Sequence, residues 1–178
     1  MPFNRKLIEV LDLPDNGRLL DIACGNGRFL KMLRQSRTFQ GFGADISDEM
    51  AKAASRDIPD MEFVATPCDK LPFQDGFFDV VTVCAAFHYF PDIVAFATEA
   101  RRIIKPGGRL YIAEIYYSKV LRTLANPFIR FHPSGDVKFY APEEITVLLN
   151  CNGFNCEPVL IDGNIMIITG SKRCSYEV

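Results

Sequence analysis

Short apolar runs alternate with segments of helical periodicity along most of the chain. The apolar runs have the length and the β-branched content of buried strands. They cover residues 18–24, 39–45, 61–65, 77–84, 109–115, 154–161 and 164–169. Helical spacing of apolar residues predicts helices at residues 3–11, 27–35, 47–56, 92–104 and 142–150. Strands that alternate with helices indicate βαβ units and a mainly parallel sheet.

Turn and cap residues refine this pattern. Ser47 is a good N-cap for the helix that follows it. The sequence Lys-Pro-Gly-Gly at residues 105–108 is a turn signal that ends one helix before the next strand. Asp162-Gly163 predicts a tight hairpin turn, so the last strand should run antiparallel to its neighbour. We therefore expect an α/β fold with a seven-stranded sheet that is parallel except for one strand.

The composition is that of a globular protein. The 178 residues include 48% hydrophobic and 24% charged residues, which excludes a disordered chain and predicts one domain over residues 1–178. No apolar run approaches the roughly 18 residues of a membrane span, and no signal peptide pattern is present, so we expect a cytoplasmic protein without a membrane partner. A net charge of −2 disfavours nucleic-acid binding through a broad basic face.

Metal binding is not expected from the ligand-type residues. The six cysteines show no CxxC spacing, and only two histidines could join them. Cys24, Cys68 and Cys84 lie in apolar or turn contexts and read as reduced cytosolic thiols. We therefore predict no metal site.

The segment at residues 21–27, Asp-Ile-Ala-Cys-Gly-Asn-Gly, lies where a strand becomes a helix. Small residues there let the backbone approach a ligand, and the start of a helix offers free N–H groups. Asp45 ends the next strand, 20 residues after Gly25, where a carboxylate can bind the hydroxyls of a ribose. The structural alternative is that the glycines only form a turn and Asp45 only caps a helix.

Two features of this loop bear on the type of ligand. The dinucleotide fingerprint has a third glycine where this chain has Leu30. The loop also begins with Asp21, whose carboxylate would repel a pyrophosphate and attract a cationic group. An adenosine ligand with a cationic head therefore fits the loop better than a dinucleotide does.

Four motifs in this order resemble those of the class I S-adenosylmethionine-dependent methyltransferases, especially the small-molecule type. The resemblance is close over residues 18–114 and looser beyond. The motifs are DIACGNG at 21–27, GADISDEM at 43–50, LPF at 71–73 followed by FDVV at 78–81, and IKPGG at 104–108. The resemblance implies a Rossmann-like doubly wound sheet of strand order 3-2-1-4-5-7-6, with S-adenosyl-L-methionine as the cofactor.

The resemblance also implies roles for individual residues. Asp21 would act on the cofactor's amino group, Asp45 would bind the ribose and Ile46 would pack on the adenine. Cys68 would donate its backbone N–H to the adenine, and Cys84 would offer its carbonyl to the methionine ammonium. The implied cofactor-binding residues are Asp21, Ala23, Cys24, Gly25, Asn26, Gly27, Asp45, Ile46, Ser47, Met50, Pro67, Cys68, Asp69, Cys84 and Ala85.

Two departures from the family pattern stand out. The family usually has an acidic residue immediately before the position of Cys68, where this chain has Pro67; Asp69 is the substitute candidate. About 17 residues precede the first strand, enough for one short helix at the start of the domain. We therefore expect the cover over the substrate to come from a lid at residues 115–140 or from another chain, which leaves an oligomer open.

The substrate side of the site has its own candidates. His88 can act as a general base, although it can equally be a hydrogen-bonded histidine that shapes the pocket. Residues 115–140 are rich in aromatic side chains and follow a strand at the ligand-binding edge; this segment is either a substrate lid or a packed connection. The candidate substrate-binding residues are His88, Tyr89, Tyr116, Tyr117 and Tyr140.

The sequence thus predicts a methyltransferase that acts on a small-molecule acceptor, but it does not identify the acceptor or its reacting atom. Two alternatives stay open. One is a non-catalytic module that binds S-adenosylmethionine as a sensor or partner subunit. The other is an NAD-dependent oxidoreductase.

Overall fold

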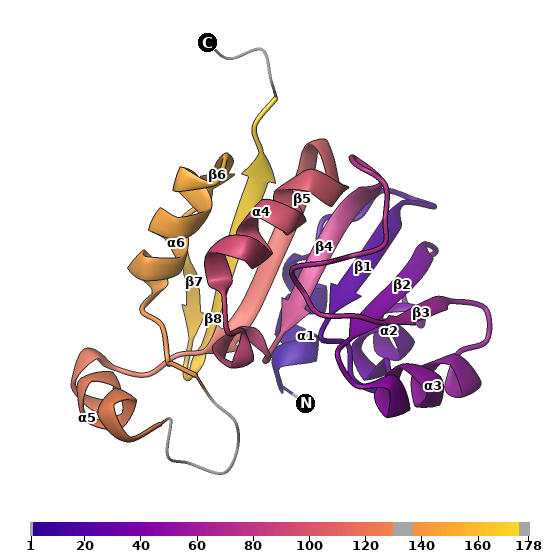
Figure 1. Ribbon diagram of the computed structural model, residues 1–178. Helices are drawn as coiled ribbons and strands as arrows, with labels where there is room; N and C mark the ends of the chain where they lie inside the picture. Colours follow the sequence, from indigo (N-terminus) through magenta and orange to yellow (C-terminus); the bar gives the residue numbers. More distant parts are fainter. Residues whose placement is uncertain (1, 130–136, 175–178) are drawn as a thin grey trace.

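The computed structural model describes residues 2–129 and 137–174 and contains a mainly parallel sheet with helices on both faces (Figure 1). The strands are β1 (Arg18–Ile22), β2 (Gln40–Asp45), β3 (Glu62–Ala65), β4 (Phe78–Cys84), β5 (Ile104–Ile115), β6 (Phe154–Cys156), β7 (Leu160–Asp162) and β8 (Ile165–Lys172). The helices are α1 (Pro2–Val10), α2 (Arg28–Leu33), α3 (Asp48–Asp57), the 3₁₀ turn η1 (Phe87–Tyr89), α4 (Ile93–Ile103), α5 (Lys119–Ile129) and α6 (Pro142–Cys151).

The strand order is β3-β2-β1-β4-β5-β8-β6, with β7 also paired to β8. Strands β1 to β5 pair in parallel, and β8 pairs antiparallel with β5, β6 and β7. With β8 in the place of the predicted seventh strand, this is the predicted order, so the Rossmann-like topology and the antiparallel last strand are confirmed.

Two core layers fix the sheet between its helices. Figure 1 shows α4 and α6 on one face and α1 and α2 behind the other. Phe96 of α4 and Leu149 of α6 are fully buried on the first face. Leu7 of α1 and Leu30 of α2 are fully buried on the second. Helix α3 packs against β2 and β3.

The edge strand predicted at residues 154–161 is broken into two, which gives the sheet an eighth strand. Cys156 pairs with Gly170 in β6, but Leu160 pairs with Ile167 in β7, so the register slips by one residue between them. Pro158 lies in this gap and has no N–H to donate to the ladder. The break therefore falls where proline makes continuous pairing impossible.

The predicted turn at residues 105–108 is part of β5. Ile104 already pairs with Phe78, and the register then shifts before Arg109 pairs with Val80. Gly107 has a φ of 75°, a conformation that glycine adopts without strain. The turn signal therefore marks a bulge inside the strand, and the prediction that the strand starts at residue 109 is wrong.

Candidate functional site

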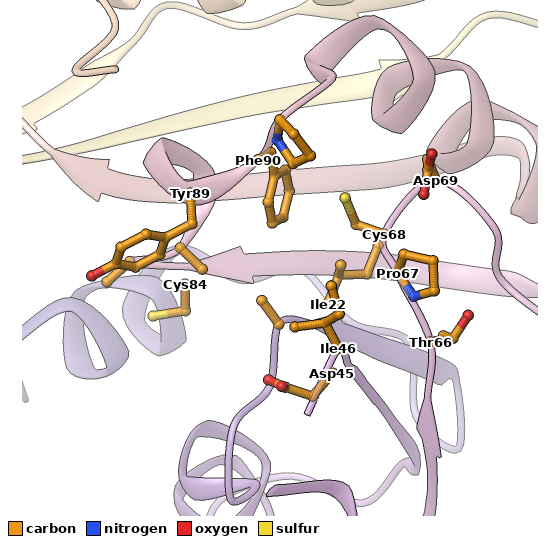
Figure 2. Close-up of a pocket in the computed structure, with 14 residues that line it drawn as sticks. Ile22, Asp45, Ile46, Thr66, Pro67, Cys68, Asp69, Cys84, Tyr89 and Phe90 are labelled. Carbon is orange, nitrogen blue, oxygen red and sulfur yellow. The ribbon is translucent and has the colours of Figure 1, made fainter. Parts of the chain in front are cut away.

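A cavity of about 380 Å³ lies at the carboxyl ends of β1, β2 and β4, within the size range of small-molecule sites. Tyr89 and Cys84 lie at one end of it, and Pro67 and Asp69 lie at the other (Figure 2). Its lining is Ile22, Ala23, Asp45, Ile46, Thr66, Pro67, Cys68, Asp69, Cys84, Ala85, Ala86, Tyr89, Phe90 and Pro91. The site is thus assembled from segments that follow four different elements.

The loop after β1 has a tightly wound backbone. Gly25 and Gly27 have φ values of 54° and 74°, in the left-handed region where glycine is favoured. A side chain at Gly27 would collide with Ile58, whose Cδ1 would lie 2.9 Å from the added Cβ. At Gly25 an added Cβ would meet nothing within 4 Å. Gly27 therefore serves helix packing, and Gly25 leaves open space beside the loop.

Asp45 connects this loop to the start of α3. Its Oδ2 accepts a hydrogen bond of 2.7 Å from the Gly25 N–H, and its Oδ1 accepts one of 2.9 Å from the Ser47 N–H. Ser47 is the N-cap, because its Oγ accepts a hydrogen bond from the Met50 N–H. Ser47 is therefore the residue that caps the helix, as predicted. Asp45 instead holds the glycine loop in place, and it also lines the cavity. A carboxylate has lone pairs for further donors such as hydroxyl groups.

Asp21 is buried beneath the loop, with 2% of its surface exposed. Burial raises its pKa to about 7, and nearby Asp45 adds to the effect, while the hydrogen bond from Thr82 opposes it. The Thr82 hydroxyl donates to Asp21 Oδ1 over 2.8 Å. A carboxyl group with this pKa changes its charge near neutral pH and would be held ionised by a cationic group.

The cavity thiols are not activated. Burial, together with the smaller effect of the negative charge of Asp69, raises the pKa of Cys68 to about 11. Burial likewise raises the pKa of Cys84, with smaller contributions from Asp21 and Glu114. Both thiols stay protonated at neutral pH, so nucleophilic cysteine chemistry is disfavoured.

The predicted cofactor residues fall into two groups. Those that line the cavity are Ala23, Asp45, Ile46, Pro67, Cys68, Asp69, Cys84 and Ala85. Those outside its lining are Asp21, Cys24, Gly25, Asn26, Gly27, Ser47 and Met50. Sequence reasoning missed Ile22, Thr66, Ala86, Phe90 and Pro91. Ile22 and Thr66 are adjacent in sequence to predicted site residues at strand ends. That adjacency is the sequence signal by which they could have been predicted.

His88 lies next to the cavity in a buried pair with Glu114. Its Nδ1 lies 2.9 Å from Glu114 Oε1, and its backbone N–H donates to Oε2 over 3.1 Å. Glu114 is 1% exposed and also accepts from the Ile115 N–H. The ring of Tyr89, which lines the cavity, lies 4.0 Å from the His88 ring between centroids. The Glu114 carboxyl group therefore orients the imidazole next to Tyr89, which lines the cavity.

The other candidate substrate residues are packed elsewhere. Tyr140 is 8% exposed and contacts Phe87 in the core. Tyr116 packs against the same core, and Tyr117 contacts Phe139 edge to face. None of the described residues at 115–129 and 137–140 lines the cavity. Residues 130–136 of the predicted lid lie outside the described residues.

Among the residues that the structure describes, no group of three or more His, Cys, Asp or Glu side chains could hold a metal ion. Within the same residues, none of the helices has the length and apolar character needed to cross a bilayer.

The cavity fits an adenosine ligand with a cationic tail. Ile46 projects at its edge with 80% of its surface exposed, an apolar wall suited to a flat base. Asp45 offers acceptors for hydroxyl groups, and the open space at Gly25 leaves room for a chain beside the loop. Asp21 is buried below the loop, where a cationic group would hold it ionised.

A model of the methyltransferase domain family matches residues 20–112, which include the glycine loop, Asp45 and β4. The chain belongs to this methyltransferase domain family. Demethylmenaquinone methyltransferase of Thermotoga maritima is 29% identical over 175 residues, with 85% of this chain and 76% of the relative covered. Across three relatives of this name, the covered share of their own length is between 65% and 82%.

Solved structures agree with this membership at the level of the fold. An S-adenosylmethionine-dependent methyltransferase from Aquifex aeolicus has a TM-score of 0.77 at 19% identity, covering 94% of this chain and 88% of that one. One chain of a complex that contains the Trm112 methyltransferase activator of Haloferax volcanii has a TM-score of 0.84 at 23% identity, covering 97% and 89%. The chain is therefore an S-adenosylmethionine-dependent methyltransferase rather than an NAD-dependent oxidoreductase.

Proposed function

We propose that this methyltransferase modifies a small aromatic acceptor with an ionisable hydroxyl group, as in a hydroquinone, and that His88 takes up the acceptor proton. The observation that carries the proposal is the buried His88–Glu114 pair beside Tyr89 at the cavity. The names of the curated relatives, which describe methyltransferases of demethylmenaquinone, support the same acceptor class.

The cofactor would be held by residues at or just after the ends of four strands, β1 to β4. Asp45 would bind the ribose, Ile46 would cover the adenine, and the Cys68 N–H would bind an adenine nitrogen. Cys84 would offer its carbonyl to the methionine ammonium, with Asp21 as the buried counter-charge. When bound, S-adenosylmethionine supplies a methyl group on a positively charged sulfur.

The chain's own contribution would be orientation and proton acceptance. Tyr89 would hold the acceptor ring against the apolar wall of the cavity. A proton taken up by His88 leaves the ring positively charged 2.9 Å from the Glu114 carboxylate, which stabilises that charge. General-base catalysis of this kind accelerates a reaction by about 10²–10⁴-fold. Glu114 would act as a positioning residue through His88.

The proposal can be tested with a short-chain demethylmenaquinol under reducing conditions, measuring formation of S-adenosylhomocysteine. We expect turnover by the unmodified protein, and a kcat lower by about 10²–10⁴-fold in His88→Gln. Glu114→Gln should lower kcat with little change in KM. Calorimetry with S-adenosylhomocysteine should give an unchanged Kd for both variants, which serves as the folding control.

Three results would contradict the proposal. Turnover of amines or thiols but not of hydroquinones would assign a different acceptor class. An unchanged kcat in His88→Gln would remove His88 from the reaction and leave it as a residue that shapes the pocket. Cofactor binding with no turnover of hydroquinones, amines or thiols would instead support the non-catalytic alternative.

A further inference from the structure

Helix α5 carries an apolar stripe that faces away from the protein. Val120, Leu121, Leu124 and Phe128 are 69%, 55%, 65% and 72% exposed. On an ideal helix of 3.6 residues per turn, these four positions fall within an arc of about 100°. Four large apolar side chains in this short segment thus form one continuous surface, which we call the α5 stripe.

The polar side of α5 is the side attached to the protein. Arg122 Nη1 donates to the Tyr117 carbonyl over 3.0 Å. The Asn126 side chain donates to the Phe139 carbonyl and accepts from the Phe139 N–H, both over 3.0 Å. Arg122 and Asn126 lie roughly opposite the α5 stripe on an ideal helix. An ordinary surface helix turns its apolar side inward, so α5 has the reverse orientation.

The helix stands apart from the sheet at the lower left of Figure 1. It follows the carboxyl end of β5, so it belongs to the edge of the sheet that also holds the cavity. The α5 stripe is therefore exposed on a helix at the same edge of the sheet as the cavity.

The charge around the stripe selects the kind of surface. No acidic residue occurs at positions 115–135, while Lys119 and Arg122 lie on α5 itself. Lys119 is exposed at the first turn of the helix. On an ideal helix both basic residues lie on the polar side, about 150° from the centre of the α5 stripe. A helix with basic residues on its polar side and Leu and Phe on the other is typical of segments that lie in the interface of a lipid bilayer.

We propose that α5 docks on the surface of an anionic lipid bilayer, with the α5 stripe inserted at the headgroup boundary and Lys119 against the headgroups. A protein partner or a second copy of this chain fits less well, because each side of a standard protein interface buries about 800 Å². One short stripe offers much less than that. The proposal differs from the expectation that a membrane plays no part, which rested on the absence of a span.

A fluorescent variant gives a direct test, because the chain contains no tryptophan. Phe128→Trp should show a blue shift and higher emission with vesicles of phosphatidylcholine and phosphatidylglycerol. Vesicles of phosphatidylcholine alone should produce a much smaller change, and added salt should weaken the response. An unshifted spectrum with the anionic vesicles would overturn the proposal.

Sedimentation with the same vesicles tests the surface itself. The double variant Leu124→Glu/Phe128→Glu should lose binding by more than tenfold, and Lys119→Gln should weaken it by about fivefold. The control is Val147→Glu, which puts one negative charge at an apolar position of α6 that is 61% exposed. This control should bind vesicles normally, and every variant should bind S-adenosylhomocysteine with an unchanged Kd.

The other occupants would give different results. If a second copy covers the α5 stripe, the unmodified protein sedimenting as a dimer and Leu124→Glu/Phe128→Glu as a monomer would overturn the membrane proposal. Equal vesicle binding by this variant and by Val147→Glu would also overturn it. None of these measurements includes a methyl acceptor, so they can fail independently of the proposed function.

Discussion

Asp45 illustrates how one residue can serve both the fold and the ligand. Its two carboxylate oxygens accept the N–H groups of Gly25 and Ser47, which belong to different loops. The sequence alone suggests that a carboxylate at an empty site bonds mainly to water. The structure instead makes it the bond that holds the glycine loop beside the start of α3. Loss of Asp45 should therefore affect stability as well as binding.

The first prediction separates these two roles. Asp45→Ala should weaken binding of S-adenosylhomocysteine by about 10- to 100-fold, because hydrogen bonds to a charged group contribute about 1.5–3 kcal/mol. It should also lower the free energy of unfolding, since two backbone donors lose their acceptor. Calorimetry and urea denaturation measure the two quantities.

Ser47→Ala is the matched control for Asp45→Ala. It removes the side chain that caps α3, which should lower the free energy of unfolding by about 1 kcal/mol. The Kd for S-adenosylhomocysteine should stay within about twofold. If Asp45→Ala behaves like Ser47→Ala, Asp45 has only a structural role.

The second prediction concerns the buried Asp21. Its pKa of about 7 in the folded protein lies above the ordinary value of 3.8. The folded state therefore holds this proton more tightly than the unfolded state, so the carboxyl group destabilises the fold increasingly as the pH rises from about 4 to 7. Asp21→Asn lacks this titration, so its free energy of unfolding should rise relative to that of the unmodified protein over that pH range. The gain should be at most about 4 kcal/mol, since a pKa change of one corresponds to about 1.4 kcal/mol.

Urea denaturation between pH 4 and pH 8 measures this gain. Asp15→Asn is the control, because Asp15 is exposed and replacing it should shift stability by a similar amount at every pH. Parallel stability curves for Asp21→Asn and the unmodified protein would show that Asp21 is not desolvated as the structure implies.

Among individual residues, the chemistry-bearing ones were the more predictable. Asp45, Pro67, Cys68 and Cys84 all reach the cavity lining, as expected from motif positions at strand ends. Phe90 and the other missed lining residues are mostly apolar, and nothing in an apolar residue type distinguishes a cavity wall from a core. The path of the chain after each strand decides that difference.

At the level of elements, the strands and helices with strong periodicity are where the sequence places them. The errors occur where a local signal is ambiguous. The glycines at 107 and 108 indicate a turn, yet pairing of Ile104 with Phe78 places them in a bulge of β5. Proline at 158 divides a strand whose apolar pattern is continuous. In both cases the neighbouring strand, which the local sequence does not reveal, determines the result.

Helix α5 was not predicted as a helix, and its orientation could not have been. Its periodicity defines an apolar side, and burial is the ordinary inference for such a side. The contacts of Arg122 and Asn126 show the opposite, because they attach the polar side of α5 to the protein. Only the tertiary structure shows which side of an amphipathic helix meets the protein.

For the whole molecule, the position of the cavity follows from the topology. The chain leaves β1 toward β2 on one side, and β4 pairs with β1 on the other. The loops after β1 and β4 therefore diverge and leave a crevice at the carboxyl ends of the strands, where open α/β sheets bind ligands. The glycine loop and Asp45, which the sequence places at strand ends, lie at this crevice in the observed strand order.

The last prediction uses this crevice as a binding site of the folded state alone. A ligand that binds only the folded protein stabilises it by about 2.7 kcal/mol at 100 times its Kd. For a chain of this size, this corresponds to a rise in Tm of roughly 5–10 °C. S-adenosylhomocysteine should produce this rise, whereas NAD at the same concentration should produce none. Because the described residues contain no cluster of three potential metal ligands, EDTA should leave the rise unchanged. A shift with NAD would contradict the assigned cofactor, and loss of the shift in EDTA with recovery on adding a divalent ion would reveal a metal site.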